Sequence, residues 1–426
     1  MMRSMYSGVS GLRVHQNKMD VIGNNIANVN TIGYKRGTMT FQEVFSQVIR
    51  GASAPQGGRG GTNPQQIGLG VNIGAISTIH TKGPAQRTDN PEDLMIDGEG
   101  FFVVSDDTNF ENRFYTRAGN FTLDRDGNLV TADGYKVLGY LADGDGEITS
   151  EIGGIRVNRT ETVAATTTKD IELRGNLDSR TPIYNEDDPE NGIHITDTII
   201  KDSLGNSYTV SFKFEKTNVN EWNVTINNVK DHADDSVMDP AQDIDITLKF
   251  DENGKLAVDS DKEADLIITK KGVRFGDDDN NAIKIDFSKL NQYANDMDAK
   301  PYADGNSSGK LEGYAIDDKG VVVGIFTNGE RKALGQLMLA KFDNSMGLQK
   351  IGGNFFVDTR NSGEPQYGTA ASGGYGAIAP GTLEMSNVDL SMEFTDMITT
   401  QRGFQANSRI ITTSDEMLQE LVNMKR

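Results

Sequence analysis

Apolar residues recur at seven-residue intervals near both ends of the chain. The N-terminal series is Met5, Leu12, Met19 and Ile26, with Val9, Ile22 and Val29 beside it. The C-terminal series is Leu390, Met397, Phe404, Ile411 and Leu418, with Phe394, Ile410 and Leu421 on the same face. This spacing predicts two helices with apolar stripes, as in the seam of a coiled coil. The alternative is two amphipathic helices that pack on one globular domain.

The two ends also differ in charge. Residues 1–50 carry six basic and two acidic side chains, a net charge of +4, whereas residues 381–426 carry four basic and seven acidic ones, a net charge of −3. Opposite charges favour contact between the two predicted helices, although each exposed pair contributes little.

From about residue 94 to residue 377 the pattern changes to the two-residue period of strands. The runs that alternate most strictly are Tyr208, Val210, Phe212 and Phe214; Ile244, Ile246, Leu248 and Phe250; and Ile283, Ile285 and Phe287. One polar face predicts an antiparallel sheet with one side in water. Turns that begin with Asp and end with Gly recur at 124–127, 202–205, 251–254 and 317–320. They indicate short hairpin loops, and helices do not alternate with these strands as they would in a nucleotide-binding sheet.

Composition marks the domain boundaries. Residues 51–70 are rich in Gly, Pro and Gln, which is typical of a loop or adaptable linker. Residues 158–300 carry 30 acidic and 17 basic side chains, a net charge of −13, and are predicted to form an outer, solvent-facing domain. We therefore expect a mainly β protein with a helical domain (1–30 and 381–426), an extended segment (31–90) and two β-rich domains of sandwich or barrel type in tandem. The inner β domain is predicted at 91–157 and 301–380, and the outer one at 158–300.

The overall composition narrows the function. The chain has 426 residues, a net charge of −20 and no cysteine. The charge disfavours nucleic acid and anionic membrane surfaces as partners, and the lack of cysteine excludes disulfides and thiolate metal sites. Residues 1–20 lack the apolar core of a secretory signal, and no apolar run approaches the length of a membrane span. These features alone would indicate a cytoplasmic protein.

We find no convincing catalytic signature. The four histidines, at 15, 80, 194 and 232, are far apart in the sequence, and the glycine pairs at 68–70 and 98–100 lack the third glycine of a dinucleotide loop. The best metal candidates are the acidic stretches Asp143–Glu147 and Asp277–Asp279, and neither completes a calcium loop. We expect no enzyme activity and no cofactor, and acidic turns are the simpler interpretation of both stretches.

Motifs at the two ends carry a family resemblance. Asn24-Asn-Ile-Ala-Asn-Val-Asn-Thr-Ile-Gly-Tyr-Lys35 resembles the N-terminal motif of flagellar rod, hook and hook-associated proteins. The segments Gly381–Leu390 and Gln401–Asn407 are similar to the matching C-terminal motif. Residues 94–102 and 115–121 resemble the inner β domain of the same family, and residues 328–348 resemble its returning half. Residues 158–300 match only in position and β character.

The resemblance implies a non-catalytic subunit that polymerises into the curved tube between flagellar rod and filament. The large middle insertion favours a hook subunit over a distal rod or hook–filament junction protein; an exported oligomeric adhesin or enzyme is the alternative of another class. Implied partners are further copies of the chain, the hook cap, distal rod and junction proteins and the type III export apparatus. Family members leave the cell without a cleaved signal peptide. The resemblance therefore implies an extracellular location, in place of the cytoplasmic one that the composition alone would indicate.

The candidate assembly interface contains the apolar stripes and the asparagines at the end of the first helix. It comprises Met5, Leu12, Met19, Ile22, Asn24, Asn25, Ile26, Asn28, Val29, Leu390, Phe394, Met397, Phe404, Ile411, Leu418 and Leu421. For the three asparagines two roles are open, capping of the helix end and hydrogen bonding between subunits.

Overall fold

The computed structural model describes residues 2–55, 57–58, 60–185, 192–232, 236–238, 245–257, 260, 262–268, 274–276 and 282–424. The chain divides into two compact units. Unit 1 comprises Met1–Val157, Tyr314–Val323 and Lys332–Arg426, and unit 2 comprises Asn158–Gly313 and Gly324–Arg331. One boundary follows Val157, and the others fall within β23 (Gly309–Ile316), within β24 (Val321–Phe326) and after Arg331, the first residue of β25. Residues 301–313 and 324–331, which the sequence pattern assigned to the inner domain, therefore fall in unit 2.

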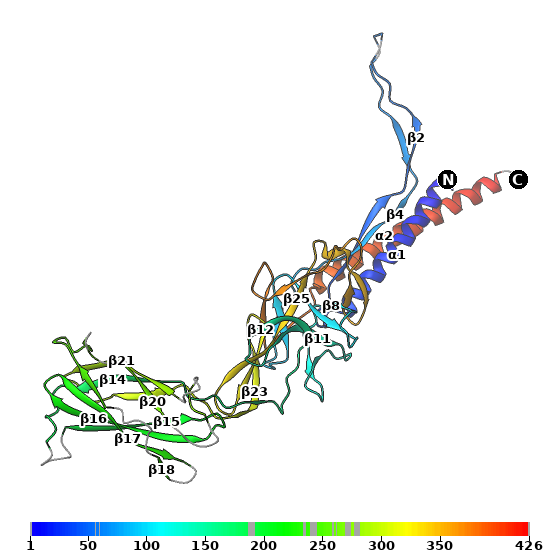
Figure 1. Ribbon diagram of the computed structural model, residues 1–426. Helices are drawn as coiled ribbons and strands as arrows, with labels where there is room; N and C mark the ends of the chain where they lie inside the picture. The colour runs from blue at the N-terminus through cyan, green and yellow to red at the C-terminus, as the bar shows by residue number, and fades with distance from the viewer. Residues whose placement is uncertain are drawn as a thin grey trace. The chain divides into compact units, whose positions relative to one another are not determined.

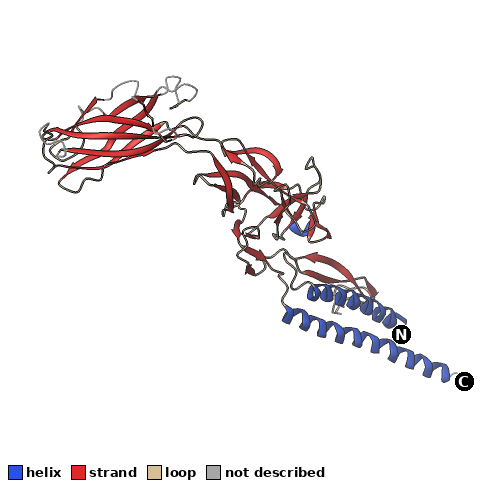
Figure 2. Ribbon diagram, turned by 90° about the horizontal axis from the view of Figure 1, so that it is seen from below, coloured by secondary structure: helices blue, strands red, loops and turns tan. Residues whose placement is uncertain are grey.

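Two long helices lie side by side in unit 1 (Figures 1 and 2). They are α1 (Met2–Ala27) and α2 (Leu390–Asn423). The side chain of Asp389 caps the start of α2 by accepting a hydrogen bond from the Ser391 amide at 2.8 Å. Asn25 of α1 contacts Glu393 near the start of α2, whereas Gly8 faces Ile411 near its end, so the helices are antiparallel.

A long antiparallel ladder projects from the helical pair (Figure 1). Strand β1 (Gly37–Glu43) pairs with β4 (Val71–Thr78), and β2 (Ser46–Arg50) pairs with β3 (Gln65–Gly68). The segment predicted as an extended linker thus contains a hairpin. Apolar and β-branched residues flank the glycine-rich stretch and form the strands, while Gly57 and Gly58 take the positive φ angles that the connection requires.

The remaining strands of unit 1 build its β body. They are β5 (Ala85–Arg87), β6 (Leu94–Asp97), β7 (Phe101–Ser105), β8 (Phe114–Thr116), β9 (Thr122–Leu123), β10 (Leu129–Val130), β11 (Lys136–Ala142), β12 (Ile148–Gly154), β25 (Arg331–Lys341), β26 (Gln349–Gly352), β27 (Phe355–Val357), β28 (Gln366–Thr369), β29 (Ala377–Pro380) and β30 (Thr382–Glu384), with a short 3-10 helix at Ser345–Gly347. The central order is β25-β11-β7-β8-β27-β26. Phe101, Tyr115 and Met338 form part of the core of this body.

The returning C-terminal segment pairs with strands from the first quarter of the chain. Strand β29 lies antiparallel to β6, and β30 lies antiparallel to β5 with Glu384 opposite Ala85. This pairing brings the C-terminal sequence motif beside the start of the β body before the chain enters α2.

Unit 2 is a β sandwich. Its strands are β13 (Thr162–Val163), β14 (Asp170–Asp178), β15 (Ile193–Lys201), β16 (Ser207–Asn218), β17 (Glu221–Asp231), β18 (Val237–Met238), β19 (Asp245–Lys249), β20 (Glu263–Ile267), β21 (Ala282–Tyr293) and β22 (Lys300–Ala303). One sheet has the order β15-β16-β17-β18 with β19 beside β17, and the other has the order β20-β21-β14-β22. One apolar core joins the two sheets and contains the buried Trp222.

The strand patterns read from the sequence are confirmed where the structure describes them. Tyr208, Val210, Phe212 and Phe214 are buried, as are Ile283, Ile285 and Phe287, whereas Ile244 lies outside the described residues. One detail differs, because β14 and β21 pair in parallel. Alternation of side chains is the same in both kinds of ladder, so the sequence pattern could not distinguish them.

The Asp–Gly turns form as expected. The glycines that close them, Gly127, Gly205, Gly254 and Gly320, all have positive φ. Asp143 belongs to a turn of the same kind, in which its Oδ1 accepts hydrogen bonds from the amides of Asp145 and Glu147, each at 3.0 Å. Asp277–Asp279 lies outside the described residues. Among the residues that the structure describes, no group of three or more acidic or histidine side chains could hold a metal ion.

Candidate assembly site

The seven-residue stripes are only partly covered when α1 packs against α2, and the buried positions of α2 are Glu393, Thr400 and Ser414 rather than stripe residues. Ile22 is buried, and the other apolar stripe residues of α1 are partly buried, namely Met5, Leu12, Met19 and Ile26. On α2 the partly buried members are Met397, Phe404, Ile411 and Leu418. Val29, which follows α1, is partly buried as well. One helix pair thus buries only part of each stripe.

Glycines in α1 and α2 allow the two helices to approach closely. The stripe pattern did not identify this feature. Gly8 and Gly11 are buried in α1. A Cβ atom at Gly11 would lie 2.6 Å from the Asn407 Nδ2 atom, and one at Gly403 would lie 2.7 Å from the His15 ring. A side chain at either position would have to displace its neighbour, so glycine allows the two helices to approach closely. The sequence feature that could have indicated this close contact is glycine within a predicted helix. Glycine is unfavourable there unless packing requires it.

Other stripe residues face water within a single copy of the chain. Leu390 is 39% exposed, Phe394 51% and Leu421 46%. Neighbouring apolar residues are also exposed, namely Met2, Tyr6 and Val9 on α1 and Met392, Ile398, Ile410, Met417 and Val422 on α2. An apolar surface that extends along two helices usually marks an interface.

The β1–β4 hairpin exposes apolar side chains too. These are Phe41, Val44, Phe45, Val48, Ile49, Ile67 and Ile76. An isolated two-stranded ribbon is marginally stable in water and gains stability when a further layer covers its apolar groups. This surface was not part of the interface expected from the sequence, because the glycine-rich stretch suggested a linker.

The asparagines at the end of α1 form hydrogen bonds within the chain. Buried Asn25 donates to the Gly37 carbonyl at 2.8 Å and to Glu393 at 3.3 Å, and it accepts from the Gly37 amide at 2.9 Å. Asn28 donates to the Asn24 carbonyl at 2.9 Å, and Asn24 donates to the Tyr34 hydroxyl at 3.3 Å. These contacts hold the chain where the helix ends.

A buried charge cluster joins the family motifs. The Lys35 ammonium lies 2.5 Å from the Glu384 carboxylate, and neither side chain is exposed to solvent. Arg117 lies 3.4 Å from the other carboxylate oxygen, and the Gly83 amide donates to Glu384 at 2.9 Å. Burial lowers the pKa of both Lys35 and Arg117, and the Glu384 carboxylate counteracts this effect. The cluster links the N-terminal motif, the C-terminal motif and the β body.

A second set of ion pairs connects the start of α2 with the segment after α1. Arg36 lies 2.7 Å from Glu393 and 3.8 Å from Asp396. The amide of Arg36 also donates to the Asn387 side chain at 2.8 Å. Opposite charges from the two ends of the chain therefore form ion pairs. These pairs lie where α1 has ended and α2 begins, not along the length of the helices.

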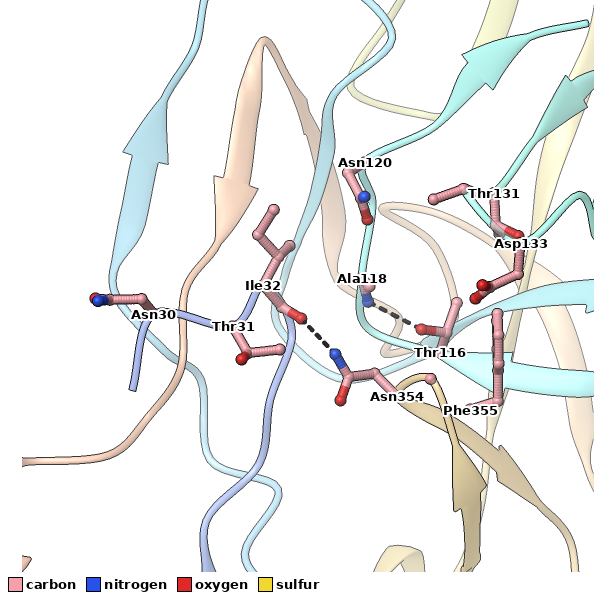
Figure 3. A pocket seen from close by; sticks show the side chains of 12 residues that line it. Asn30, Thr31, Ile32, Thr116, Ala118, Asn120, Thr131, Asp133, Asn354 and Phe355 are labelled. Atoms are coloured by element: carbon pink, nitrogen blue, oxygen red, sulfur yellow. Dashed lines mark hydrogen bonds between the residues drawn. The ribbon is translucent and has the colours of Figure 1, made fainter. Parts of the chain in front are cut away.

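A polar pocket of about 330 Å³ lies where the N-terminal motif contacts the β body (Figure 3). Its lining includes Thr31, Asn120, Asp133 and Asn354. The Asn354 side chain donates to the Ile32 carbonyl at 2.9 Å, which fixes the motif on the β body. Among its described lining residues, Asp133 is the one titratable side chain.

Comparison with known proteins agrees with these observations. Four family descriptions match: "Flagella basal body rod protein" (residues 5–35), "Flagellar hook protein FlgE/F/G D1 domain" (95–175), "Flagellar basal body protein FlaE D2 domain" (176–305) and "Flagellar basal body rod FlgEFG protein C-terminal" (379–424). The flagellar hook protein FlgE of Borreliella burgdorferi is 41% identical, with 100% of each chain covered. FlgE of Salmonella typhimurium is 33% identical, with 99% of this chain and 100% of that protein covered.

The chain belongs to the flagellar hook protein family.

Two further similarities qualify the relationship. The basal-body rod protein FlgG of Bacillus subtilis is 32% identical over the full length of both chains, so rod and hook proteins share this architecture. A crystal structure of Helicobacter pylori flagellar hook protein FlgE2 covers 70% of this chain and all of that chain, with a TM-score of 0.55 and 15% identity. At that identity the similarity supports the fold alone.

Membership of this family makes the chain a structural subunit of the flagellar hook, which lies outside the cell. The rod, junction and adhesin or enzyme alternatives are not favoured. No helix of the described part of the chain is long and apolar enough to cross a membrane.

Proposed function

We propose that copies of this chain polymerise through α1, α2 and the β1–β4 hairpin into the flexible, curved tube of the hook. In this role the polymer couples the rod to the filament and transmits torque. The observation that carries the proposal is the extended apolar surface that one copy leaves in water on both helices and on the hairpin.

We infer that one set of stripe residues makes contacts within a copy and another set makes contacts between copies. The partly or fully buried residues of the stripes pair α1 with α2 inside one copy, while Leu390, Phe394 and Leu421 contact neighbouring copies. Different patches then meet in each contact between copies. Such a contact is heterologous, so it leaves a free surface at the end and allows the polymer to grow.

We infer that unit 2 contributes weak contacts that permit bending. Residues 158–300 carry a net charge of −13, and like-charged surfaces resist permanent association. A tube that bends during rotation needs outer contacts that break and reform, which suits polar and acidic surfaces better than apolar ones.

The remaining partners follow from the family. We propose contacts with the hook cap, distal rod and hook–filament junction proteins, and export through the type III apparatus without a cleaved signal peptide. The acidic net charge of −20 disfavours nucleic acid and membrane insertion. No catalytic role is proposed.

The substitution Phe394→Asp tests the helical interface. The Phe394 side chain is 51% exposed in a single copy, so the substitution leaves the packing of the copy largely intact. In the polymer a neighbouring copy covers the exposed half of Phe394, and loss of that apolar contact costs about 1–1.5 kcal/mol. An Asp carboxylate buried at the same contact adds to this cost. The critical concentration for polymerisation should therefore rise at least about tenfold.

The assay is sedimentation of polymers combined with negative-stain electron microscopy. Val219→Asp is the matched control, because Val219 is 71% exposed in a turn of unit 2. Tubes that form normally with the control and fail with Phe394→Asp would support the proposal. Equal effects of both substitutions would contradict assembly through the helices.

A further inference from the structure

A cavity of about 310 Å³ in unit 1 is lined by charged and polar side chains from separate segments. Here it is named the His80–Arg117 cavity. His80 follows β4, Arg117 follows β8, and Lys341 ends β25. Ser345 of the short 3-10 helix also lines this cavity.

Three buried polar atoms at this cavity have no hydrogen-bond partner among the described residues. They are the Nε atom of Arg117 and both ring nitrogens of His80. Arg117 is only 4% exposed, and its other guanidinium nitrogens contact Glu384 and donate to the Gly98 carbonyl at 2.8 Å. An unsatisfied buried polar group costs about 1–3 kcal/mol, so such groups normally have a bound partner.

The charges around the cavity leave an excess of one positive charge. The cations that face His80 or line the cavity are Lys35, Arg117, Lys341 and Lys350, and the carboxylates are Glu99, Asp343 and Glu384. Lys35 is paired with Glu384, and Lys341 with Glu99 at 2.5 Å. Burial and the fields of Lys35, Arg117 and Lys350 lower the pKa of His80 to about 4, so the ring is neutral at physiological pH.

We propose that the His80–Arg117 cavity binds a carboxylate or a small oxyanion. The anion would accept hydrogen bonds from the Arg117 Nε–H group and from one N–H of the neutral His80 ring. Lys341 and Ser345 supply further donors at the cavity. The anion compensates the excess positive charge around the cavity and satisfies the buried donors.

Two sources share this chemistry. One is a free anion such as inorganic phosphate or acetate. The other is an Asp or Glu side chain of a neighbouring copy, a source that rests on the proposed polymerisation. The first requires only a single chain, so failure of polymerisation would not remove it.

The test is a nuclear magnetic resonance titration of the His80 ring in the full-length monomer. The chain has four histidines, and the signal of His80 is assigned from its loss in His80→Phe. A bound anion favours the protonated ring, so phosphate or acetate should raise the pKa of His80 by about one unit or more in a saturable manner. His194, which lies in unit 2, is the internal control.

The double variant Lys341→Met with Glu99→Gln removes one ion pair and keeps the net charge of the lining unchanged. It should weaken anion binding several-fold while the chain stays folded, since Glu99 is 71% exposed. In assembled tubes, a raised pKa of His80 without added anion would identify the carboxylate of a neighbouring copy as the ligand. No change in either monomer or tube, or equal changes for His80 and His194, would overturn the proposal.

Discussion

Replacement of Glu384 by Gln should destabilise unit 1 strongly. Glu384 is fully buried between Lys35, which is equally buried, and Arg117, which is 4% exposed. The substitution preserves the size of the side chain and allows the Gly83 amide to keep an oxygen acceptor. It removes the negative charge that compensates two buried cations.

The expected cost follows from the burial of the cluster. Loss of one partner of a buried ion pair costs about 3–5 kcal/mol, because the remaining charge lacks compensation in a medium of low polarity. No correction for solvent screening is needed, since none of the three side chains is appreciably exposed. We expect a loss of about 3 kcal/mol or more in the free energy of unfolding of unit 1.

The two units provide separate signals in one urea titration. Far-ultraviolet circular dichroism at 222 nm reports mainly α1 and α2 of unit 1, whereas fluorescence reports Trp222, the single tryptophan, in the core of unit 2. Glu384→Gln should shift the first transition and leave the second unchanged. Glu99→Gln is the control, because Glu99 is 71% exposed and a solvent-exposed ion pair contributes little to stability. A loss below about 1 kcal/mol for Glu384→Gln, or an equal shift of the Trp222 transition, would refute the argument.

Three further predictions are checked by the same unfolding transition of unit 1, followed by circular dichroism at 222 nm. Gly119→Ala should prevent normal folding of unit 1, since its Cβ would lie 1.7 Å from the Leu94 carbonyl oxygen, whereas Gly23→Ala in α1 meets no atom within 4 Å and should stabilise by up to about 1 kcal/mol. Without added oxyanions, unit 1 should lose up to about 3 kcal/mol between pH 6.5 and pH 4, because the unfolded chain protonates His80 first; His80→Phe should flatten this pH dependence. Asn25→Ala should cost about 1–2 kcal/mol, since it leaves partly buried backbone groups of Gly37 without partners, and an unchanged transition would contradict the role assigned to its side chain.

The sequence by itself determined the local elements. The seven-residue spacing of Leu12, Met19, Phe404 and Ile411 was enough to predict two helices, and the alternation around Tyr208 was enough to predict buried strands. Both patterns record which face of an element is turned towards other protein atoms. The terminal motifs determined the family, because they are specific in composition and position.

Only the tertiary structure decided which residues meet. Lys35, Arg117 and Glu384 are separated by tens to hundreds of positions, and their meeting depends on the pairing of β30 with β5. A period in the sequence states that a face is buried, but it does not state which partner buries it. For the same reason it could not distinguish Phe404, which is partly buried within one copy, from Phe394, which is 51% exposed. The physical cause is that burial depends on long-range contacts, whereas periodicity is a property of each segment alone.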